Sequence, residues 1–221
     1  MVMIIAHRGA SMLSPENTIS AIHSAIYLNC DMVEIDVRRC KTGELVLMHD
    51  KNVKRTTNGK GVVKQMPLEE LKKLKVGKDG GIPTLDDALS YAKGKIKVNI
   101  EIKELELVDD VMRLVDKYDM RKEIIISSFL IHSLIEVSQR YPDVKTALLL
   151  RRAKRDSFVK AKELKLDAFN ISHHFIKKKF IDDAHHEGIK VNVYTVNDIP
   201  KIEEMKKLEV DGIITNHPEL V

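Results

Sequence analysis

Short runs of apolar residues, many of them β-branched, alternate with amphipathic segments along the whole chain of 221 residues. The runs predict eight β-strands, at residues 2–6, 32–37, 97–102, 124–127, 145–149, 168–171, 191–195 and 212–215. The segments between them space their apolar residues as one face of a helix would. Strand and helix in regular alternation are typical of a parallel sheet with helices outside it. Eight such units predict an α/β fold of the TIM (β/α)8 barrel class, for which about 250 residues is typical.

The ends of the predicted helices carry further signals. Ser14 precedes a proline, Thr84 lies three residues before an aspartate, and Asp198 is closely followed by another proline. Residues of these types are typical of helix caps and first turns. Only residues 216–221 follow the last predicted strand, so we expect the eighth helix to be short or absent.

One apolar run, residues 45–48, breaks the alternation. It follows the second strand after only four residues, which is too few for a parallel crossover, so it predicts a hairpin. If Thr42 and Gly43 form the tip, register counting places His49 opposite Asp36. The side chain of His49 would then return to the mouth of the barrel.

The segment after this hairpin is rich in Lys, Gly and Thr and contains one predicted short helix, at residues 68–74. We expect residues from about 45 to 82 to form a small insertion packed over the mouth of the barrel. A chain of this length needs no second domain, so residues 1–221 are predicted to form a single domain.

Composition narrows the possible partners. The chain has 37 Lys and Arg residues against 33 Asp and Glu, a net charge of +4, and the basic residues form no arginine-rich or aromatic-interleaved stripe. Nucleic acid is therefore not an expected partner. The two cysteines, Cys30 and Cys40, lack metal-type spacing and do not resemble a disulfide framework, which fits a reducing compartment. Because neither a signal sequence nor a run of transmembrane length is visible, we expect a soluble, cytoplasmic protein without stable membrane insertion.

Seven side chains with chemical potential stand at or just beyond the downstream ends of apolar runs. The carboxyl ends of parallel strands form one rim, where α/β folds gather functional residues from distant parts of the chain. Residues two apart on a strand project from the same face, as Glu34 and Asp36 do. The seven are His7, Arg8, Glu34, Asp36, His49, Glu101 and Lys103.

The types of these residues suggest a chemistry. Three carboxylates at one rim repel each other, and a divalent cation removes that repulsion; oxygen-only ligands favour Mg²⁺ or Ca²⁺ over zinc. Arg8 and Lys103 can hold an anion, for which a phosphate ester is the expected candidate. His7 and His49 can act as general base and general acid, in either assignment.

Short motifs run through the chain from end to end: HRG at 7–9, PENT at 15–18, EIDV at 34–37, HD at 49–50, RTTNGKG at 55–61, IPTLDD at 82–87, EIK at 101–103, YTVND at 194–198 and DGIITNHP at 211–218. In content and order they resemble the glycerophosphodiester phosphodiesterase family. The resemblance implies a TIM barrel with a small insertion after the second strand. It also implies metal-dependent hydrolysis of glycerophosphodiesters, a small-molecule substrate class, to glycerol 3-phosphate and an alcohol.

The roles of family residues at matching positions divide the seven side chains in the same way. The resemblance implies metal ligands at Glu34, Asp36 and Glu101, acid and base at His7 and His49, and phosphate contacts at Arg8 and Lys103. The ion would be Mg²⁺ or Ca²⁺, with Mn²⁺ a further candidate. Family members are thought to let a neighbouring substrate hydroxyl attack phosphorus, giving a cyclic phosphate that water then opens.

Two positions depart from the family pattern. Tyr194 stands where the family usually has tryptophan; it offers a flat wall for a glycerol moiety and adds a hydroxyl. Asn216 stands where an aspartate often follows the last strand, with no evident consequence. Two further residues of the PENT motif, Glu16 and Asn17, are as readily explained by support of the first helix as by a role in the site.

Other functions stay open on the sequence. A lysophospholipase D type activity on the same scaffold would require an insertion with exposed apolar surface. A catalytically idle barrel would bind phosphodiesters without hydrolysing them. A sugar-phosphate isomerase would share the barrel but needs no cluster of three carboxylates, so a metal requirement separates it.

Overall fold

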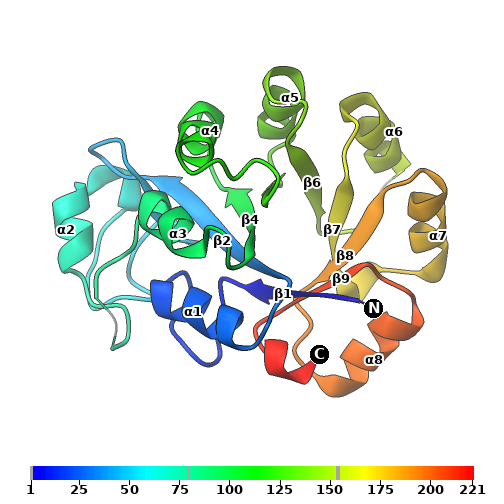
Figure 1. The fold of residues 1–221 in the computed structure, drawn as a ribbon, viewed down its shortest axis with the longest axis horizontal. Coiled ribbons are helices and arrows are strands. Elements are labelled where there is room, and N and C mark those ends of the chain that lie inside the picture. The colour runs from blue at the N-terminus through cyan, green and yellow to red at the C-terminus, as the bar shows by residue number, and fades with distance from the viewer. Residues whose placement is uncertain (1, 79, 153–154) are drawn as a thin grey trace.

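A closed parallel β-barrel forms the centre of the computed structural model, which describes residues 2–78, 80–152 and 155–221 (Figure 1). Its eight parallel strands are β1 (Met3–His7), β2 (Met32–Arg39), β4 (Lys97–Ile102), β5 (Ile124–Ser128), β6 (Lys145–Leu150), β7 (Ala168–Ser172), β8 (Lys190–Tyr194) and β9 (Gly212–Thr215). The sheet closes because β1 pairs with both β2 and β9. The predicted TIM-barrel fold is confirmed.

Helices lie outside the barrel, between successive strands (Figure 1). They are α1 (Ile19–Tyr27), α3 (Leu85–Ala92), α4 (Val108–Lys117), α5 (Ile131–Arg140), α6 (Arg155–Leu164), α7 (Lys178–His186) and α8 (Ile199–Lys207). After β9 the chain forms only a 3₁₀ turn, Pro218–Leu220, so the predicted short or missing eighth helix is confirmed. In the part of the chain that the structure describes, no helix combines the length and apolarity needed to cross a bilayer.

Two of the three predicted helix starts are confirmed. The Thr84 hydroxyl accepts a hydrogen bond from the backbone of Asp87, whose carboxylate accepts one in return, and Asp198 caps α8. The start predicted at Ser14 is wrong, because α1 begins only after its cap, Thr18. Asn17, just before that cap, has a left-handed φ of 56°, which is incompatible with an α-helix.

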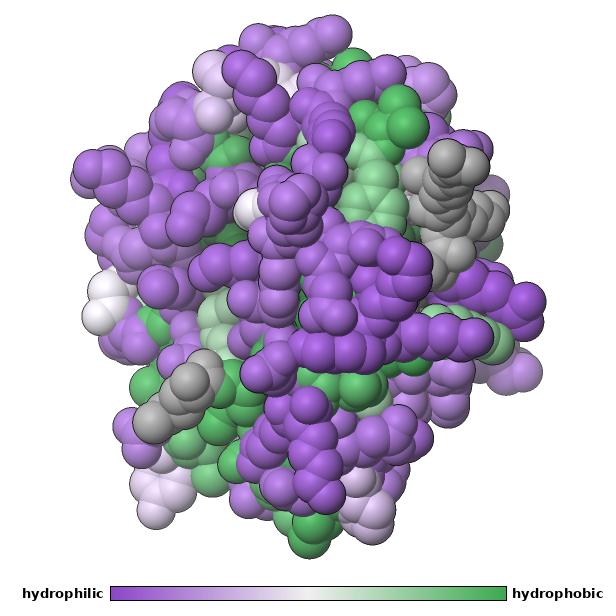
Figure 2. All heavy atoms as spheres, turned by 90° about the vertical axis from the view of Figure 1, so that its right-hand side faces the viewer, coloured by the Kyte–Doolittle hydropathy of each residue, from purple (hydrophilic) through white to green (hydrophobic). Residues whose placement is uncertain are grey.

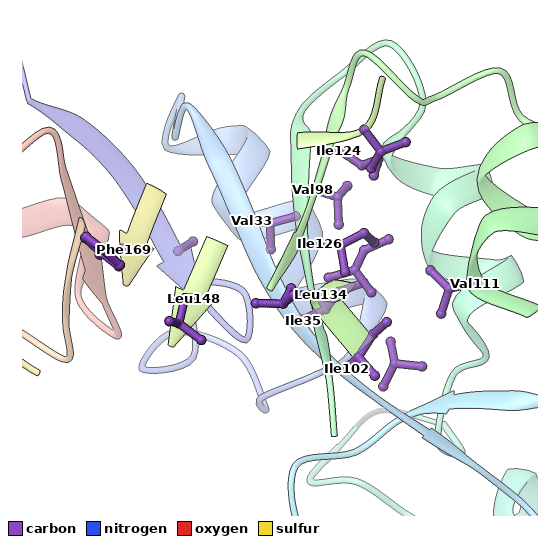
Figure 3. Close-up of a cluster of buried hydrophobic side chains, with 14 of the residues drawn as sticks. Val33, Ile35, Val98, Ile102, Val111, Ile124, Ile126, Leu134, Leu148 and Phe169 are labelled. Atoms are coloured by element: carbon purple, nitrogen blue, oxygen red, sulfur yellow. The ribbon is translucent and has the colours of Figure 1, made fainter. Parts of the chain in front are cut away.

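The alternation of side chains along the strands separates the core from the site. On β2, Val33 and Ile35 point outward and pack beneath the helices with Val98 of β4 and Ile126 of β5 (Figure 3). Burying each such side chain contributes roughly 1.5–3 kcal/mol. The residues between them on the same strands must therefore face into the barrel. This apolar face fixes the register that positions the polar side chains described below.

The hairpin prediction is confirmed, but its register is wrong by one residue. β3 (Leu45–Leu47) pairs antiparallel with β2, and Met48, not His49, lies opposite Asp36. Cys40 donates a backbone hydrogen bond to Glu44, so the loop has three residues instead of two. Its last residue, a glycine, has a left-handed φ of 103°.

The segment between β3 and α3 builds a small apolar cluster of its own. It contains a 3₁₀ turn, Val63–Gln65, and the predicted short helix, which is α2 (Leu68–Lys73). Buried side chains of this segment, with Cys40 of the hairpin loop and Val46 of β3, form the cluster: Cys40, Val46, Met48, Val53, Val63, Met66, Leu71, Val76 and Ile82. Figure 1 places α2 at the periphery, beside the β2–β3 hairpin and α3. On the opposite side of the molecule, hydrophilic side chains dominate the surface and interrupt its hydrophobic areas (Figure 2).

Candidate active site

Three neighbouring strands bring the predicted acidic residues together. Glu34 and Asp36 face inward from β2, and strand pairing sets Asp36 beside Glu101 of β4 and Glu34 beside His7 of β1. One carboxylate oxygen from each of the three acids lies within 4.8 Å of the others. Among the described residues, this is the one group of three His, Cys, Asp or Glu side chains with the spacing of a metal site.

Burial changes the protonation of these carboxylates. Glu34, Asp36 and Glu101 are only 3 %, 0 % and 7 % exposed. Loss of hydration, together with the charge of Asp36, raises the pKa of Glu34 well above its usual range and that of Glu101 to about 7. Burial also opposes ionisation of Asp36, but Lys103 and Arg8 outweigh it and hold its pKa at about 2. Without a bound cation, Glu34 and Glu101 therefore keep their protons to a higher pH than free carboxyls do, because Lys103 and Arg8 do not compensate three ionised carboxylates.

Two cations lie against the cluster. Lys103 Nζ is 2.8 Å from Asp36 Oδ1 and 2.5 Å from Glu101 Oε1. The Nε atom of Arg8 is 3.2 Å from Asp36 Oδ2, and the Arg8 backbone N–H donates to Glu34 Oε2 at 2.9 Å. Both predicted phosphate-binding residues therefore lie beside the predicted metal ligands.

The turn after β1 explains the HRG motif. Arg8 and Gly9 both have left-handed φ values, 57° and 84°, so the chain reverses sharply at the strand end. A Cβ atom on Gly9 would lie 2.6 Å from the backbone carbonyl carbon of Ala21 in α1. Only glycine allows this close approach, which directs the Arg8 side chain toward β2.

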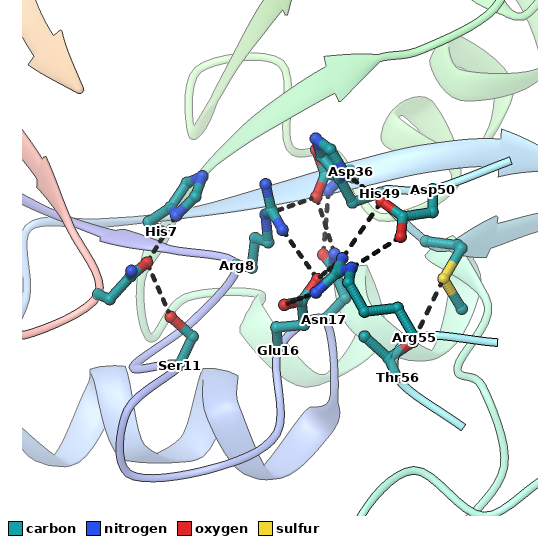
Figure 4. A network of polar contacts seen from close by, with 12 residues as sticks. His7, Arg8, Ser11, Glu16, Asn17, Asp36, His49, Asp50, Arg55 and Thr56 are labelled. Carbon is teal, nitrogen blue, oxygen red and sulfur yellow. Dashed lines mark hydrogen bonds and ion pairs between the residues drawn. The ribbon is translucent and has the colours of Figure 1, made fainter. Parts of the chain in front are cut away.

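Both uncertain residues of the PENT motif contact the site. Asn17 Nδ2 donates to Asp36 Oδ2 at 2.8 Å, and its Oδ1 accepts from the Asp36 backbone N–H at 3.1 Å. Glu16 accepts hydrogen bonds from Arg8 and from Arg55, at 2.8 Å and 2.7 Å (Figure 4). Arg55, which the insertion contributes, also donates to Asp50 at 2.7 Å. Arg55 opens the RTTNGKG motif, but no role was predicted for it because its partners lie far away along the chain.

His7 and His49 have different hydrogen-bond partners. His7 Nδ1 donates to Asn216 Oδ1 at 2.7 Å, and burial with the charge of Arg8 lowers the pKa of His7 to about 4. His49 Nδ1 lies 2.6 Å from the carboxylate of Asp50. Burial also lowers the pKa of His49, while Asp36 and Asp50 oppose that shift. Asn216 thus has a definite contact, which its position in the sequence did not reveal.

A buried arginine holds the backbone of His49 in place despite the different register. Arg38 donates from Nε and Nη2 to the His49 carbonyl, at 3.0 Å and 2.8 Å, and from Nη1 to Glu104 at 2.8 Å. No local pattern singles out Arg38, because its partners are 11 and 66 residues away along the chain.

Six of the seven predicted residues border a cavity of about 360 Å³ at the carboxyl end of the barrel: His7, Arg8, Glu34, His49, Glu101 and Lys103. Its other side is lined from the ends of β5 to β8, by residues that include Phe129, Leu149, Arg151, Phe175 and Tyr194. Among the described residues of the predicted insertion, about 45–82, His49 lines the cavity, and Arg55 reaches its rim through hydrogen bonds to Glu16 and Asp50. A larger open groove, of about 690 Å³, lies outside the barrel beside α1 and α3 and contains neither histidine nor the carboxylate cluster.

Three histidines of the adjacent pairs His173–His174 and His185–His186 have contacts away from the carboxylate cluster. His173 Nδ1 lies 3.2 Å from the carbonyl of Tyr194, and its ring packs on that of His174. His185 Nε2 lies 2.8 Å from Asp211 at the opposite, amino-terminal end of the strands.

Comparison with known proteins gives a consistent result. The model of the glycerophosphoryl diester phosphodiesterase family matches residues 7–220. A glycerophosphodiester phosphodiesterase of Caldanaerobacter subterraneus is 36% identical over 98% of this chain and 95% of its own. One of Bacillus altitudinis is 30% identical over 99% and 96%.

Solved structures agree with this result. A phosphodiesterase of Oleispira antarctica, in complex with the product sn-glycerol-3-phosphate, has a TM-score of 0.91 at 26% identity, over 99% of this chain and 94% of its own. A glycerophosphodiester phosphodiesterase of Thermotoga maritima has a TM-score of 0.84 at 29% identity, over 100% and 96%. The chain belongs to the glycerophosphoryl diester phosphodiesterase family, whose members are phosphoric diester hydrolases.

Proposed function

We propose that the chain hydrolyses glycerophosphodiesters to glycerol 3-phosphate and an alcohol, with the help of one divalent cation. One observation carries this proposal: three buried carboxylates lie together beside a single cavity, and Glu34 and Glu101 line that cavity with two basic side chains and two histidines that have different partners. We also propose that residues 1–221 act as one domain, with the insertion at about 45–82. The cytoplasmic location stays a prediction.

The residues fit a divalent cation held by Glu34, Asp36 and Glu101. Glu34 Oε1 is buried and accepts no hydrogen bond from any described residue, so it has a free ligand position. Three carboxylates against Arg8 and Lys103 leave one formal negative charge uncompensated. The all-oxygen donor set suits Mg²⁺, Ca²⁺ or Mn²⁺. When bound, the ion would offset negative charge that develops on the phosphate oxygens.

Arg8 and Lys103 would bind the phosphate beside that position. Arg8 is oriented by Glu16, which Arg55 holds in turn, and so its guanidinium is fixed before the substrate arrives. Such fixed donors cost little reorganisation when charge develops on the phosphoryl group. Asn17 would have a positioning role, because it holds the Asp36 carboxylate through two hydrogen bonds.

The partners of the histidines support an assignment of roles. Asn216 keeps the proton of neutral His7 on Nδ1, which leaves the Nε2 lone pair free to take a proton from the attacking hydroxyl. Asp50 supports the protonated form of His49, which would donate its proton to the leaving alcohol oxygen. As the new O–P bond forms, the bond from phosphorus to the alcohol breaks. If the neighbouring glycerol hydroxyl attacks, water then opens the cyclic phosphate with the two roles reversed.

A lysophospholipase D type activity is a second candidate because Phe129 and Phe175 expose apolar surface at the cavity, each 44 % exposed. This surface comes from the loops after β5 and β7, not from the insertion. A lysophospholipid in the same assay separates the two activities.

The test is release of glycerol 3-phosphate from glycerophosphoethanolamine by the purified protein, with EDTA and after return of Mg²⁺, Ca²⁺ or Mn²⁺. We expect EDTA to abolish release, one of the ions to restore it, and Glu34→Gln to lack it. Glu69→Gln, on the exposed side of α2, is the matched control and should keep full activity. Metal and phosphodiester binding without any turnover would favour the idle barrel.

A further inference from the structure

The side of the cavity away from the carboxylates contains a charge that the proposed chemistry does not use. Arg151 directly follows β6, which lies across the barrel from β1 and β2 (Figure 1). Arg151 lines the cavity and is exposed to it. On this side of the cavity it is the sole charged residue among the described lining residues.

Arg151 differs from the other arginines of the site in having no internal partner. Arg8, Arg38 and Arg55 each pair with a carboxylate at 2.7–2.8 Å. Among the residues that the structure describes, none forms an ion pair with Arg151. Its charge acts on the nearby Tyr194, whose pKa burial raises to about 12 and Arg151 lowers in part. The guanidinium is therefore directed to the cavity and available to an anion.

The aromatic side chains beside Arg151 do not form a binding site for a cationic ligand. Phe129 and Tyr194 pack edge to face, with ring centroids 6.3 Å apart. The guanidinium of Arg152 lies over the ring of Phe175, 4.1 Å from the ring centroid. A quaternary ammonium group is normally bound over free aromatic faces, and here it would also meet the charge of Arg151. This side therefore favours a negative group over a positive one.

We propose that Arg151 forms a second anion-binding subsite, so that the preferred substrates are phosphodiesters joined to a second anionic group, either a phosphate or a carboxylate. The first phosphate would lie at Arg8 and Lys103, and the second group would accept hydrogen bonds from the fork of Arg151. This inference rests on the proposed phosphodiesterase function of the same cavity, and it names the substrates that the function would prefer.

Two matched substrate pairs test the subsite. Glycerophosphoglycerol is compared with the bis-phosphodiester that carries one further glycerophosphate, after correction for its two cleavable bonds. Glycerophosphoethanolamine is compared with glycerophosphoserine, which differs from it by one carboxylate. We expect the doubly anionic member of at least one pair to have a kcat/KM about 3- to 10-fold higher, a modest gain because Arg151 is exposed to solvent. The pair that shows the gain identifies the second group.

Variants assign the gain to Arg151. Arg151→Gln should remove the preference, and Arg151→Glu should reverse it in the same pair. Arg113→Gln, which removes an exposed arginine charge from α4, should leave the preference unchanged. A wild-type protein without preference in both pairs, or a preference that survives Arg151→Gln, would overturn the inference.

Calorimetry separates this inference from the proposed function. The dissociation constants of the four compounds are measured with wild-type and Arg151→Gln protein, at fixed metal concentration. Tighter binding of a doubly anionic compound to the wild type alone supports the subsite even if nothing is hydrolysed, an outcome that would contradict the proposed function instead. Equal binding of both members of each pair to both proteins would contradict the subsite.

Discussion

The two halves of the barrel mouth are built differently. In the half formed by β1, β2 and β4, charged side chains contact one another: Lys103 pairs with Asp36 and Glu101, and Arg8 with Asp36 and Glu16. In the half formed by β5 to β8, the cavity is lined by aromatic rings and by Arg151, which forms no ion pair with any residue that the structure describes. The first half resembles a fixed reaction centre, whereas the second half has the character of a surface that selects substrates.

The difference follows from where the residues stand. Glu34, Asp36 and Glu101 are strand residues, so their direction and spacing are fixed by the pairing that also packs the core. Phe129, Arg151 and Phe175 come after strand ends, where no pairing fixes them. We therefore expect substitutions in the first half to impair the reaction and substitutions in the second half to change substrate preference.

The largest effect is expected at the two histidines. His7→Ala and His49→Ala should each lower kcat by about 10²–10⁴-fold, the usual contribution of a general acid or base, with little change in metal affinity. His23→Ala, on the exposed side of α1, is the control. A loss of less than about tenfold in either site variant would remove that histidine from the chemical step.

The next largest expected effect is on the free energy of unfolding, which should depend on pH. In metal-free protein Glu101 keeps its proton up to about pH 7, whereas in the unfolded chain it ionises near its usual pKa of 4.5. Between these values the folded state binds more protons, so stability should fall as pH rises, by up to about 3 kcal/mol. Chemical denaturation from pH 4.5 to 8, with and without metal, measures this effect.

Metal binding should offset this loss of stability at higher pH, because the metal binds the ionised form of the Glu101 carboxylate. The stabilisation by metal should therefore grow as pH rises toward 7, and Glu101→Gln should show less of the metal-free pH dependence. Stability of metal-free wild type that rises across this range would contradict the assigned protonation.

A smaller effect is expected from Asn17→Gly, which removes the side chain that orients Asp36 but tolerates the left-handed φ at this position. Metal affinity should fall by about 10–100-fold, as for other residues that orient metal ligands. Asn29→Gly is a matched control, because Asn29 has a nearly identical φ of 55° and lies between α1 and β2, at the opposite end of the strands. Unchanged affinity in titrations of Asn17→Gly would make Asn17 a structural residue only.

The smallest effect is expected at Tyr194, in the second half. Tyr194→Phe removes the hydrogen bond from its hydroxyl to the Leu150 carbonyl, worth about 1 kcal/mol of stability. Steady-state kinetics should show kcat changed by less than about threefold, with KM moving more. A loss of kcat comparable to that at the histidines would contradict the division between the halves.

The sequence predicted the first half better than the second. Strand periodicity and the motifs identified seven charged or imidazole residues there, because period-two spacing fixes which side chains share a face, but they did not identify Arg38 or Arg55. The sequence did not predict the one-residue shift in the register of the hairpin, because the length of its loop depends on the conformation of Gly43. The contact of His7 with Asn216 spans 209 residues, and no local pattern reports such a distance. The position of Arg151 at the cavity likewise depends on the closure of the barrel, which no local pattern shows.

The most direct test of the reaction centre is a crystal structure with Mn²⁺ and glycerol 3-phosphate, located by the anomalous signal of the metal. We predict one Mn²⁺ ion bound by Glu34, Asp36 and Glu101, with the phosphate beside Arg8 and Lys103. Manganese at another place, or phosphate bound away from these cations while the carboxylate cluster holds no metal, would contradict the account.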